Sequence, residues 1–105
     1  MRLKDRVALI TGAGGGIGEA TALRFAEEGA SLVLVDIQLE RIENLAQKIS
    51  RQGGHALSQE MDVRNRNEVQ RAVQKVAKEF GRLDILINNA GLNIAVVARK
   101  TPEEA

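Results

Sequence analysis

The stretch Thr11-Gly12-Ala13-Gly14-Gly15-Gly16-Ile17-Gly18 follows an apolar run at residues 7–10 and leads directly into a helical pattern. Glycine has no side chain, so backbone N–H groups and the N-terminus of the next helix can come close to a phosphate. A glycine-rich turn between a strand and a helix is typical of pyrophosphate-binding loops. Taken alone, the stretch is also compatible with a tight turn that binds no ligand.

On either side of this stretch, short apolar segments alternate with amphipathic helical patterns. We expect strands at residues 7–11, 31–36, 56–61 and 84–88. We expect helices at residues 16–28, 39–49 and 65–80, followed by Gly29, by Gly53 and Gly54, and by Gly81. In the first helix, we expect Ile17, Ala20, Leu23 and Ala26 to face the core. The order βαβαβαβ predicts an α/β fold with a doubly wound, Rossmann-type parallel sheet.

The polarity of the strands predicts a sheet order of 3-2-1-4. Residues 56–61 include Ser58, Gln59 and Glu60, which places the third strand at an edge. The fourth strand, residues 84–88, then lies at the opposite margin, although it is as apolar as the central strands. We expect this margin to be uncovered, and the isolated chain to associate with itself or with another segment.

The length of 105 residues suits one domain, and the sequence contains no repeat or linker. Thr101-Pro102-Glu103-Glu104 has the pattern of a helix start, yet the sequence ends one residue later. We therefore interpret residues 1–105 as the front part of a longer, apparently truncated protein. A frayed polar tail is the alternative.

Composition excludes several classes of function. Fifteen Lys and Arg residues against fourteen Asp and Glu give a net charge of +1, which provides no basic surface for nucleic acid or an anionic membrane. The absence of cysteine excludes disulfides and thiolate metal sites, and we expect no metal site. No apolar run approaches the length of a membrane span. We expect a cytoplasmic protein.

Polar or glycine residues also follow the other expected strands. Asp36 ends the second strand, where a carboxylate can accept hydrogen bonds from both ribose hydroxyls of an adenosine, or can simply cap the next helix. Asp62-Val63 follows the third strand and Asn88-Asn89-Ala90-Gly91 ends the fourth. Each is also compatible with a simple turn. Their convergence on the carboxyl edge of the sheet, where open α/β sheets bind ligands, favours a binding site.

Together, the motif Thr11-Gly12-x-x-x-Gly16-x-Gly18, Asp36, Asp62-Val63 and the Asn-Asn-Ala-Gly turn resemble the short-chain dehydrogenase/reductase family. The resemblance implies that Gly12 makes the turn, that Gly16 admits the pyrophosphate and that Gly18 permits helix packing. It also implies that Asn88 ties the fourth strand to the loop near Thr11. The implied cofactor-binding set is Gly12, Gly14, Gly15, Gly16, Ile17, Gly18, Asp36, Asp62, Val63, Asn89, Ala90 and Gly91.

The family implies hydride transfer between a nicotinamide cofactor and an alcohol or carbonyl substrate, and a homo-oligomer. Its catalytic Ser, Tyr-x-x-x-Lys pair and Asn belong beyond residue 105, and this sequence contains no Tyr, so we assign no catalytic residue. The resemblance therefore implies that residues 1–105 are the dinucleotide-binding half and that the catalytic half is absent from them. We expect NAD to be preferred over NADP, because Asp36 would repel the additional phosphate while Gly15 and Ile37 provide no positive charge. Two alternatives remain: an S-adenosylmethionine-dependent methyltransferase-like domain, since residues 14–18 also fit G-x-G-x-G, and a non-catalytic dinucleotide-binding module.

Overall fold

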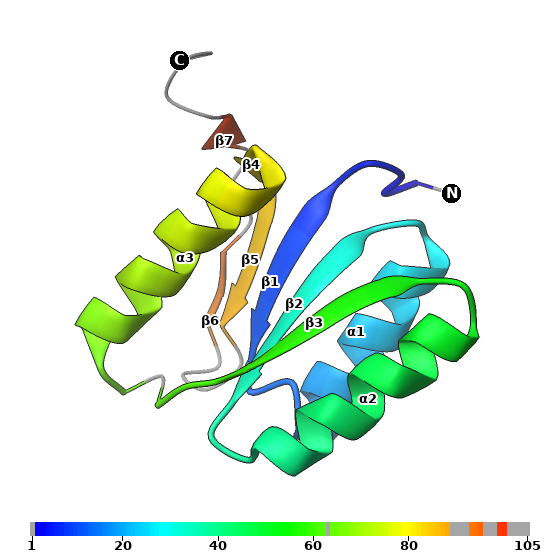
Figure 1. Ribbon diagram of the computed structural model, residues 1–105, viewed down its shortest axis with the longest axis horizontal. Coiled ribbons are helices and arrows are strands. Elements are labelled where there is room, and N and C mark those ends of the chain that lie inside the picture. The colour runs from blue at the N-terminus through cyan, green and yellow to red at the C-terminus, as the bar shows by residue number, and fades with distance from the viewer. Residues whose placement is uncertain (1, 63, 89–92, 96–98, 101–105) are drawn as a thin grey trace.

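A twisted sheet with helices on both faces is the central feature of the structure, a computed structural model (Figure 1). It describes residues 2–62, 64–88, 93–95 and 99–100. The helices are α1 (Gly16–Glu27), α2 (Leu39–Arg51) and α3 (Arg66–Phe80). The strands are β1 (Val7–Thr11), β2 (Ser31–Asp36), β3 (His55–Glu60), β4 (Arg82–Leu83), β5 (Ile85–Asn88), β6 (Asn93–Ala95) and β7 (Arg99–Lys100).

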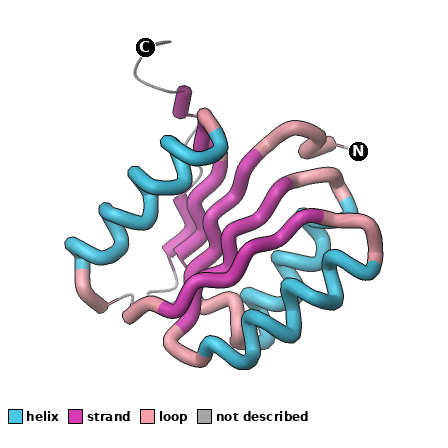
Figure 2. Tube along the Cα trace, viewed as in Figure 1, coloured by secondary structure: helices cyan, strands magenta, loops and turns pink. Residues whose placement is uncertain are grey.

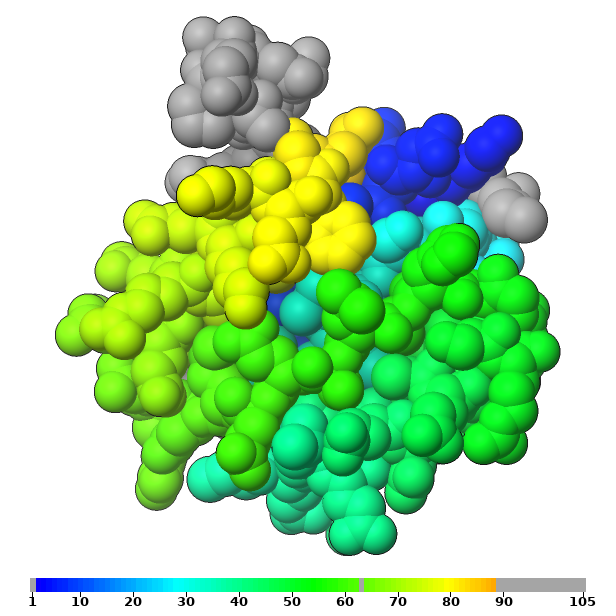
Figure 3. Space-filling model, in the orientation of Figure 1, coloured from blue at the N-terminus to red at the C-terminus, as the bar shows by residue number. Residues whose placement is uncertain are grey.

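The main sheet has the order β3-β2-β1-β5-β6, in which β3, β2, β1 and β5 are parallel (Figure 2). The expected α/β doubly wound fold and the order 3-2-1-4 are therefore confirmed, with β5 as the fourth strand. As its polar residues predict, β3 lies at an edge of the sheet. The strand begins and ends one residue earlier in the sequence than the expected range 56–61. Figure 3 shows the face of the molecule on which the residues of β3 reach the surface.

The prediction of an uncovered margin beside β5 is wrong. The chain returns antiparallel to β5, so that β6 pairs with it in the register Leu86 to Ala95 and Asn88 to Asn93. This pairing satisfies backbone N–H and C=O groups that would otherwise be free at the margin. A second, two-stranded sheet pairs β4 with β7. Strands of two or three residues are too short to show an alternating pattern in the sequence.

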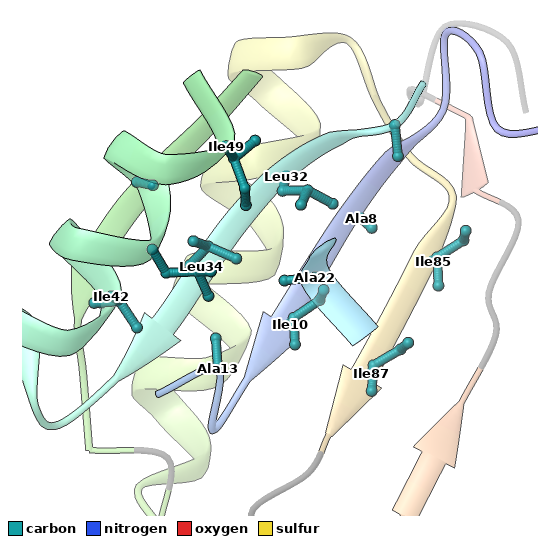
Figure 4. Close-up of a cluster of buried hydrophobic side chains, with 13 residues drawn as sticks. Ala8, Ile10, Ala13, Ala22, Leu32, Leu34, Ile42, Ile49, Ile85 and Ile87 are labelled. Carbon is teal, nitrogen blue, oxygen red and sulfur yellow. The ribbon is translucent and has the colours of Figure 1, made fainter. Parts of the chain in front are cut away.

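Two apolar clusters fill the two faces of the sheet, because alternate residues of a strand point in opposite directions. One cluster joins β1, β2 and β5 to α1 and α2, and includes Ala8, Ile10, Leu32, Leu34, Ile42, Ile49, Ile85 and Ile87 (Figure 4). The other faces α3 and includes Val7, Leu9, Val33, Val35, Ala72 and Val76. The central strands are thus buried on both sides, as their near-continuous apolar sequence predicts.

The expected inner face of α1 is correct only in part. Leu23 and Ala26 pack against the core as expected. Ala20 is exposed and Ile17 is 69% exposed, and the buried residues of the helix are Gly18 and Ala22. The cause is a backbone contact: a Cβ atom on Gly18 would collide with the carbonyl oxygen of Gly12. The close approach of the helix to the loop therefore determines which side of α1 faces the sheet. The pattern of apolar side chains alone does not determine it.

The third helix begins and ends as predicted. The Asn65 side chain caps its N-terminus by accepting hydrogen bonds from the backbone N–H groups of Asn67 and Glu68, at 3.0 and 3.3 Å. The helix ends at Gly81, whose φ of 77° is left-handed. The helix-start pattern at residues 101–104 lies outside the described residues. In the part of the chain that the structure describes, no helix is long and apolar enough to cross a membrane.

Candidate functional site

The carboxyl ends of the parallel strands bring several polar residues to one edge of the sheet. Thr11 is the β1 residue paired with Asn88 of β5, and Asp36 of β2 is paired with Glu60 of β3. Asp62 lies two residues beyond Glu60. The ends of four strands that are separated in sequence therefore lie next to one another, as the parallel arrangement predicts.

A side-chain hydrogen bond joins the first of these segments to the last. The hydroxyl of Thr11 lies 2.9 Å from Oδ1 of Asn88, and Thr11 is 1% exposed. This contact confirms that Asn88 ties its strand to the start of the glycine-rich loop.

Backbone contacts fix the conformation of the loop between β1 and α1. Gly12 has a φ of 63°, a left-handed conformation that glycine adopts without strain. The N–H of Ala13 donates to the carbonyl of Val35 at 3.2 Å, and the N–H of Gly15 donates to the carbonyl of Gly12 at 3.1 Å. The loop is therefore held against the end of β2.

The N-terminus of α1 is open and lacks a side-chain cap. Gly15 occupies the N-cap position, and the first backbone bond runs from Glu19 to Gly15. Among the described residues, the N–H groups of Gly16, Ile17 and Gly18 have no hydrogen-bond acceptor. A Cβ atom on Gly16 would meet nothing within 4 Å, so the bare backbone at this position is not required by packing. These free donors and this open space fit an anionic group such as a pyrophosphate.

Asp36 lies directly beside the loop. Its Oδ2 accepts a hydrogen bond from the N–H of Gly14 at 2.9 Å, and its Oδ1 accepts one from the N–H of Gln38 at 2.9 Å. A Cβ atom on Gly14 would lie 2.9 Å from Oδ2, so any side chain at this position would have to displace the Asp36 carboxylate. Each carboxylate oxygen has a second lone pair, and the partly exposed side chain can still accept hydrogen bonds from two hydroxyls.

Asp62 forms an ion pair that the sequence interpretation missed. The Arg64 guanidinium donates from Nε to Oδ1 at 3.0 Å and from Nη2 to Oδ2 at 2.8 Å. The Arg64 backbone N–H also donates to Oδ1, at 3.0 Å. These hydrogen bonds lower the pKa of Asp62 to about 2. Asp62 is therefore an anionic hydrogen-bond acceptor at the end of β3.

A second arginine near the loop was also missed. Nη1 of Arg41, in the first turn of α2, lies 3.5 Å from the carbonyl oxygen of Gly14. Arg41 borders a pocket of about 310 Å³ between the loop and α2. The other residues that line the pocket are Ala13, Gly14, Glu19, Asn44, Leu45 and Lys48. The only sequence signal was a basic residue five positions after Asp36, on the exposed side of the helix.

Four of the predicted cofactor-binding residues, Val63, Asn89, Ala90 and Gly91, lie outside the described residues. The structure places the other eight in the loop, at the start of α1 and at the ends of β2 and β3. No group of three or more His, Cys, Asp or Glu residues in the described ranges could hold a metal ion.

Comparisons with known proteins match this arrangement. The family model described as short chain dehydrogenase matches residues 6–105. Among curated relatives, (2S)-[(R)-hydroxy(phenyl)methyl]succinyl-CoA dehydrogenase subunit BbsD of Thauera aromatica is 43% identical over 103 residues. That match covers 98% of this chain and 42% of the relative, so the chain spans about two fifths of the relative's length.

Two similar solved structures contain different cofactors. An NAD⁺-bound xylitol dehydrogenase has a TM-score of 0.76 and 40% identity, with 82% of this chain and 33% of the other covered. A metagenomic short-chain oxidoreductase in complex with NADP has a TM-score of 0.78 and 31% identity, with 82% of this chain and 39% of the other covered. The overall fold is therefore shared by relatives that bind either cofactor.

Proposed function

Because the chain belongs to the short-chain dehydrogenase/reductase family, we propose that residues 1–105 are the cofactor-binding part of a nicotinamide-dependent oxidoreductase. Its substrate would be a small alcohol or carbonyl compound. The observation that carries the proposal is the uncapped N-terminus of α1, with its free N–H groups, next to the carboxylate of Asp36. The contact between Thr11 and Asn88 supports it further, because a methyltransferase-like site gives this contact no role.

Different residues of the site would bind different parts of the cofactor. Gly16, Ile17 and Gly18 would hold the pyrophosphate through their backbone N–H groups. Asp36 would accept hydrogen bonds from the adenosine ribose, next to the backbone of Gly14. The ionised carboxylate of Asp62 would accept a hydrogen bond from the adenine amino group. By resemblance, Gly12 and Gly15 would shape the loop, Val63 would contact the adenine, and Asn89, Ala90 and Gly91 would line the ribose.

When bound, the nicotinamide ring supplies or accepts the hydride. The residues of this chain would hold and orient the dinucleotide, but the sequence contains no tyrosine that could donate a proton as in the family. We propose that proton transfer and substrate binding belong to a catalytic half outside residues 1–105. Within these residues we assign binding roles and no catalytic role.

We also propose that NAD is preferred over NADP. A phosphate on the ribose hydroxyl next to Asp36 would introduce like charge beside this carboxylate, whose oxygens already accept hydrogen bonds from Gly14 and Gln38. Repulsion between like charges about 4 Å apart costs roughly 1 to 4 kcal/mol in a partly exposed site. Because related structures contain either cofactor, the preference depends on local residues and not on the fold.

Calorimetric titration of the chain with NADH and NADPH tests this preference. The wild-type protein should bind NADH more tightly. Asp36→Asn removes the charge and should shift the ratio of the two dissociation constants toward NADPH by about tenfold. Glu43→Asn on the exposed side of α2 is the matched control and should leave the ratio unchanged. Equal affinity of the wild-type protein for both cofactors would contradict the preference.

A cytoplasmic location, expected from the composition, and a homo-oligomeric state, implied by the family resemblance, stay predictions. The absence of cysteine is consistent with a reducing compartment. Sedimentation analysis of the purified protein would measure the oligomeric state, and fractionation of the source cells would test the location.

A further inference from the structure

We propose that the outer edge of β3 is a self-association surface, on which β3 of a second copy of this chain pairs antiparallel to it, with Leu57 of each copy opposite that of the other. The two main sheets then join into one continuous sheet about a twofold axis. The surface includes no residue of the glycine-rich loop, so this inference does not depend on the proposed function.

The outer edge of β3 is open for pairing. β3 pairs with β2 on one side, and within the described ranges no strand pairs with its other side (Figure 1). Backbone N–H and C=O groups on that side therefore have no ladder partner. Proline, lysine and bulges are the features that protect such edges from pairing. β3 contains neither proline nor lysine, and its register with β2 is continuous from His55 to Glu60.

An apolar side chain is exposed in the middle of this edge strand. Leu57 is 53% exposed. The other large apolar residues that are exposed in the described part of the chain, Ile17 and Ile37, lie at the candidate cofactor site, whereas Leu57 does not. Leu57 borders an open groove of about 470 Å³ between β3 and α3, whose apolar lining includes Val33, Val76 and Phe80. Pairing at this edge would cover an apolar surface that the single chain leaves in contact with water.

The position of Leu57 selects the register of the pair. Residues directly opposite each other in an antiparallel pair point to the same face, so a residue on the twofold axis lies opposite itself. With Leu57 on the axis, the two exposed leucines contact each other, and Ala56 lies opposite Ser58 of the second copy. A register one residue later would put Ser58 on the axis and leave Leu57 opposite the polar side chain of Gln59. Contact between two apolar side chains stabilises a pair of strands, so the first register is favoured.

Charges on α2 are complementary in the same arrangement. A second groove of about 430 Å³ runs between α2 and β3, and exposed residues of one side of α2 line it together with Ala56 and Ser58. Glu43 and Arg51 lie two helical turns apart on that side, and neither forms an ion pair with a described residue. The twofold axis makes the two α2 helices antiparallel, which brings Glu43 of each copy toward Arg51 of the other. The surface is therefore complementary to itself in charge as well as in apolar contact.

Sedimentation equilibrium of the 105-residue chain over a range of concentrations tests the surface. The wild-type chain should form a dimer whose proportion rises with concentration. Leu57→Lys places two like charges opposite each other and should raise the dissociation constant of the dimer by at least about tenfold. Ile37→Lys is the matched control, because it makes the same change at an exposed apolar residue outside β3. It should leave the dissociation constant within about twofold of the wild-type value.

Reversal of charges tests the contact between the two α2 helices. Glu43→Arg alone and Arg51→Glu alone should each raise the dissociation constant by about fivefold, because each puts like charges together. The two changes combined restore opposite charges and should return the constant to within about twofold of the wild-type value. Weakening by both single changes without recovery in the combined variant would contradict this arrangement of the helices.

Disulfide cross-linking tests the register, since the chain has no cysteine of its own. Leu57→Cys would bring two Cα atoms to about 4.5 to 5.5 Å from each other, within the range that a disulfide spans. This variant should form a covalent dimer under mild oxidation. Gln59→Cys is the control, because its two Cα atoms would lie roughly 13 Å apart along the strands, too far for a disulfide.

Three outcomes would overturn the surface. The wild-type chain could sediment as a monomer at every concentration. The dimer could persist unchanged in Leu57→Lys, which would mean that another surface forms it. If Leu57→Lys does not fold, the cysteine variants decide: cross-linking of Gln59→Cys without Leu57→Cys, or of neither, would also overturn the pairing.

Discussion

The hydroxyl of Thr11 and Oδ1 of Asn88 are hydrogen-bonded at 2.9 Å, although 77 positions separate the two residues. Thr11 ends β1 at the glycine-rich loop, and Asn88 ends β5 next to residues 89–91, which we propose to line the cofactor ribose. Through this one contact, the position of the loop and the position of the fourth parallel strand depend on each other.

Thr11→Val should destabilise the protein. The substitution keeps the volume of the buried side chain but leaves Oδ1 of Asn88 without its donor, at an expected loss of about 1 to 3 kcal/mol in the free energy of unfolding. Thr11→Ser restores the hydroxyl and is the control, with most of the stability retained. Urea denaturation of the three proteins would measure the difference, and equal midpoints for the valine and wild-type proteins would contradict the role of this hydrogen bond.

Gly16→Ala should weaken cofactor binding, whereas Gly18→Ala should reduce the stability of the fold. Space around Gly16 is open, so the Gly16→Ala protein should fold normally. Its affinity for NADH should fall by at least about tenfold, because the added methyl group enters the proposed pyrophosphate site. A methyl group on Gly18 would collide with the backbone of Gly12 and Ala13, and should cost about 2 kcal/mol or more of folding stability.

Thermal unfolding and calorimetric titration of the two variants separate these effects. Each variant serves as the control for the other, because both replace a glycine of the same loop with alanine. Normal NADH affinity in a folded Gly16→Ala protein would show that the pyrophosphate does not lie against this residue.

Asp84 should stabilise the protein only above acidic pH. It is buried before β5 and accepts hydrogen bonds from the N–H of Val7 at 2.8 Å and from Nη2 of Arg82 at 2.7 Å. Burial by itself raises the pKa of Asp84, but the hydrogen bonds from Arg82 and Val7 and the charge of Arg82 outweigh it, so the pKa is lowered. A lowered pKa in the folded state means that the ionised form is favoured by folding.

The stabilisation by Asp84 is therefore present above the unfolded pKa of about 4 and is lost as the pH falls through the lower, folded value. Asp84→Asn should reduce the free energy of unfolding by about 1 to 3 kcal/mol near neutral pH. The difference between the variant and the wild-type protein should shrink steadily below about pH 4. A difference that does not depend on pH in urea denaturation would show that the charge of Asp84 plays no part.

The 105-residue chain should turn over no substrate, even where it binds NADH. Hydride transfer to a carbonyl needs a proton donor, and this sequence has no tyrosine to supply one. General acid catalysis alone contributes about 10² to 10⁴ in rate, and lost substrate positioning removes a further large factor. The measurement is NADH absorbance in the presence of a panel of ketones and aldehydes. Consumption that depends on the chain would show that a catalytic group has been overlooked.

The fold was predictable because the apolar segments, the helical patterns and the polarity of the strands all indicate the same structure. Alternating apolar segments and helical stripes predicted the parallel order, and the polar residues of β3 predicted its place at an edge. By contrast, the inner face of α1 depends on how closely Gly18 approaches Gly12 in three dimensions. Residue periodicity contains no information about that contact. For the same reason, the pairing of β6 with β5 could not be read from three residues.

The candidate site was predictable where backbone chemistry dominates and less so where side chains meet. Glycines and strand-end carboxylates mark the loop and Asp36 in any sequence of this pattern. The positions of Arg41 and Arg64 beside Gly14 and Asp62 depend on side-chain direction, which the spacing of exposed arginines does not reveal. The sequence therefore indicated the acidic residues of the site, and the tertiary structure showed which basic residues lie beside them.

Calorimetric titration of the wild-type chain with NADH and, separately, with S-adenosylmethionine tests whether the glycine-rich loop and Asp36 bind a nicotinamide dinucleotide. We expect saturable binding of one NADH per chain, abolished by a bulky substitution at Gly16, and no heat of binding from S-adenosylmethionine. Binding of S-adenosylmethionine without binding of NADH, or binding of neither, would contradict the assignment of this loop and Asp36 to a nicotinamide dinucleotide.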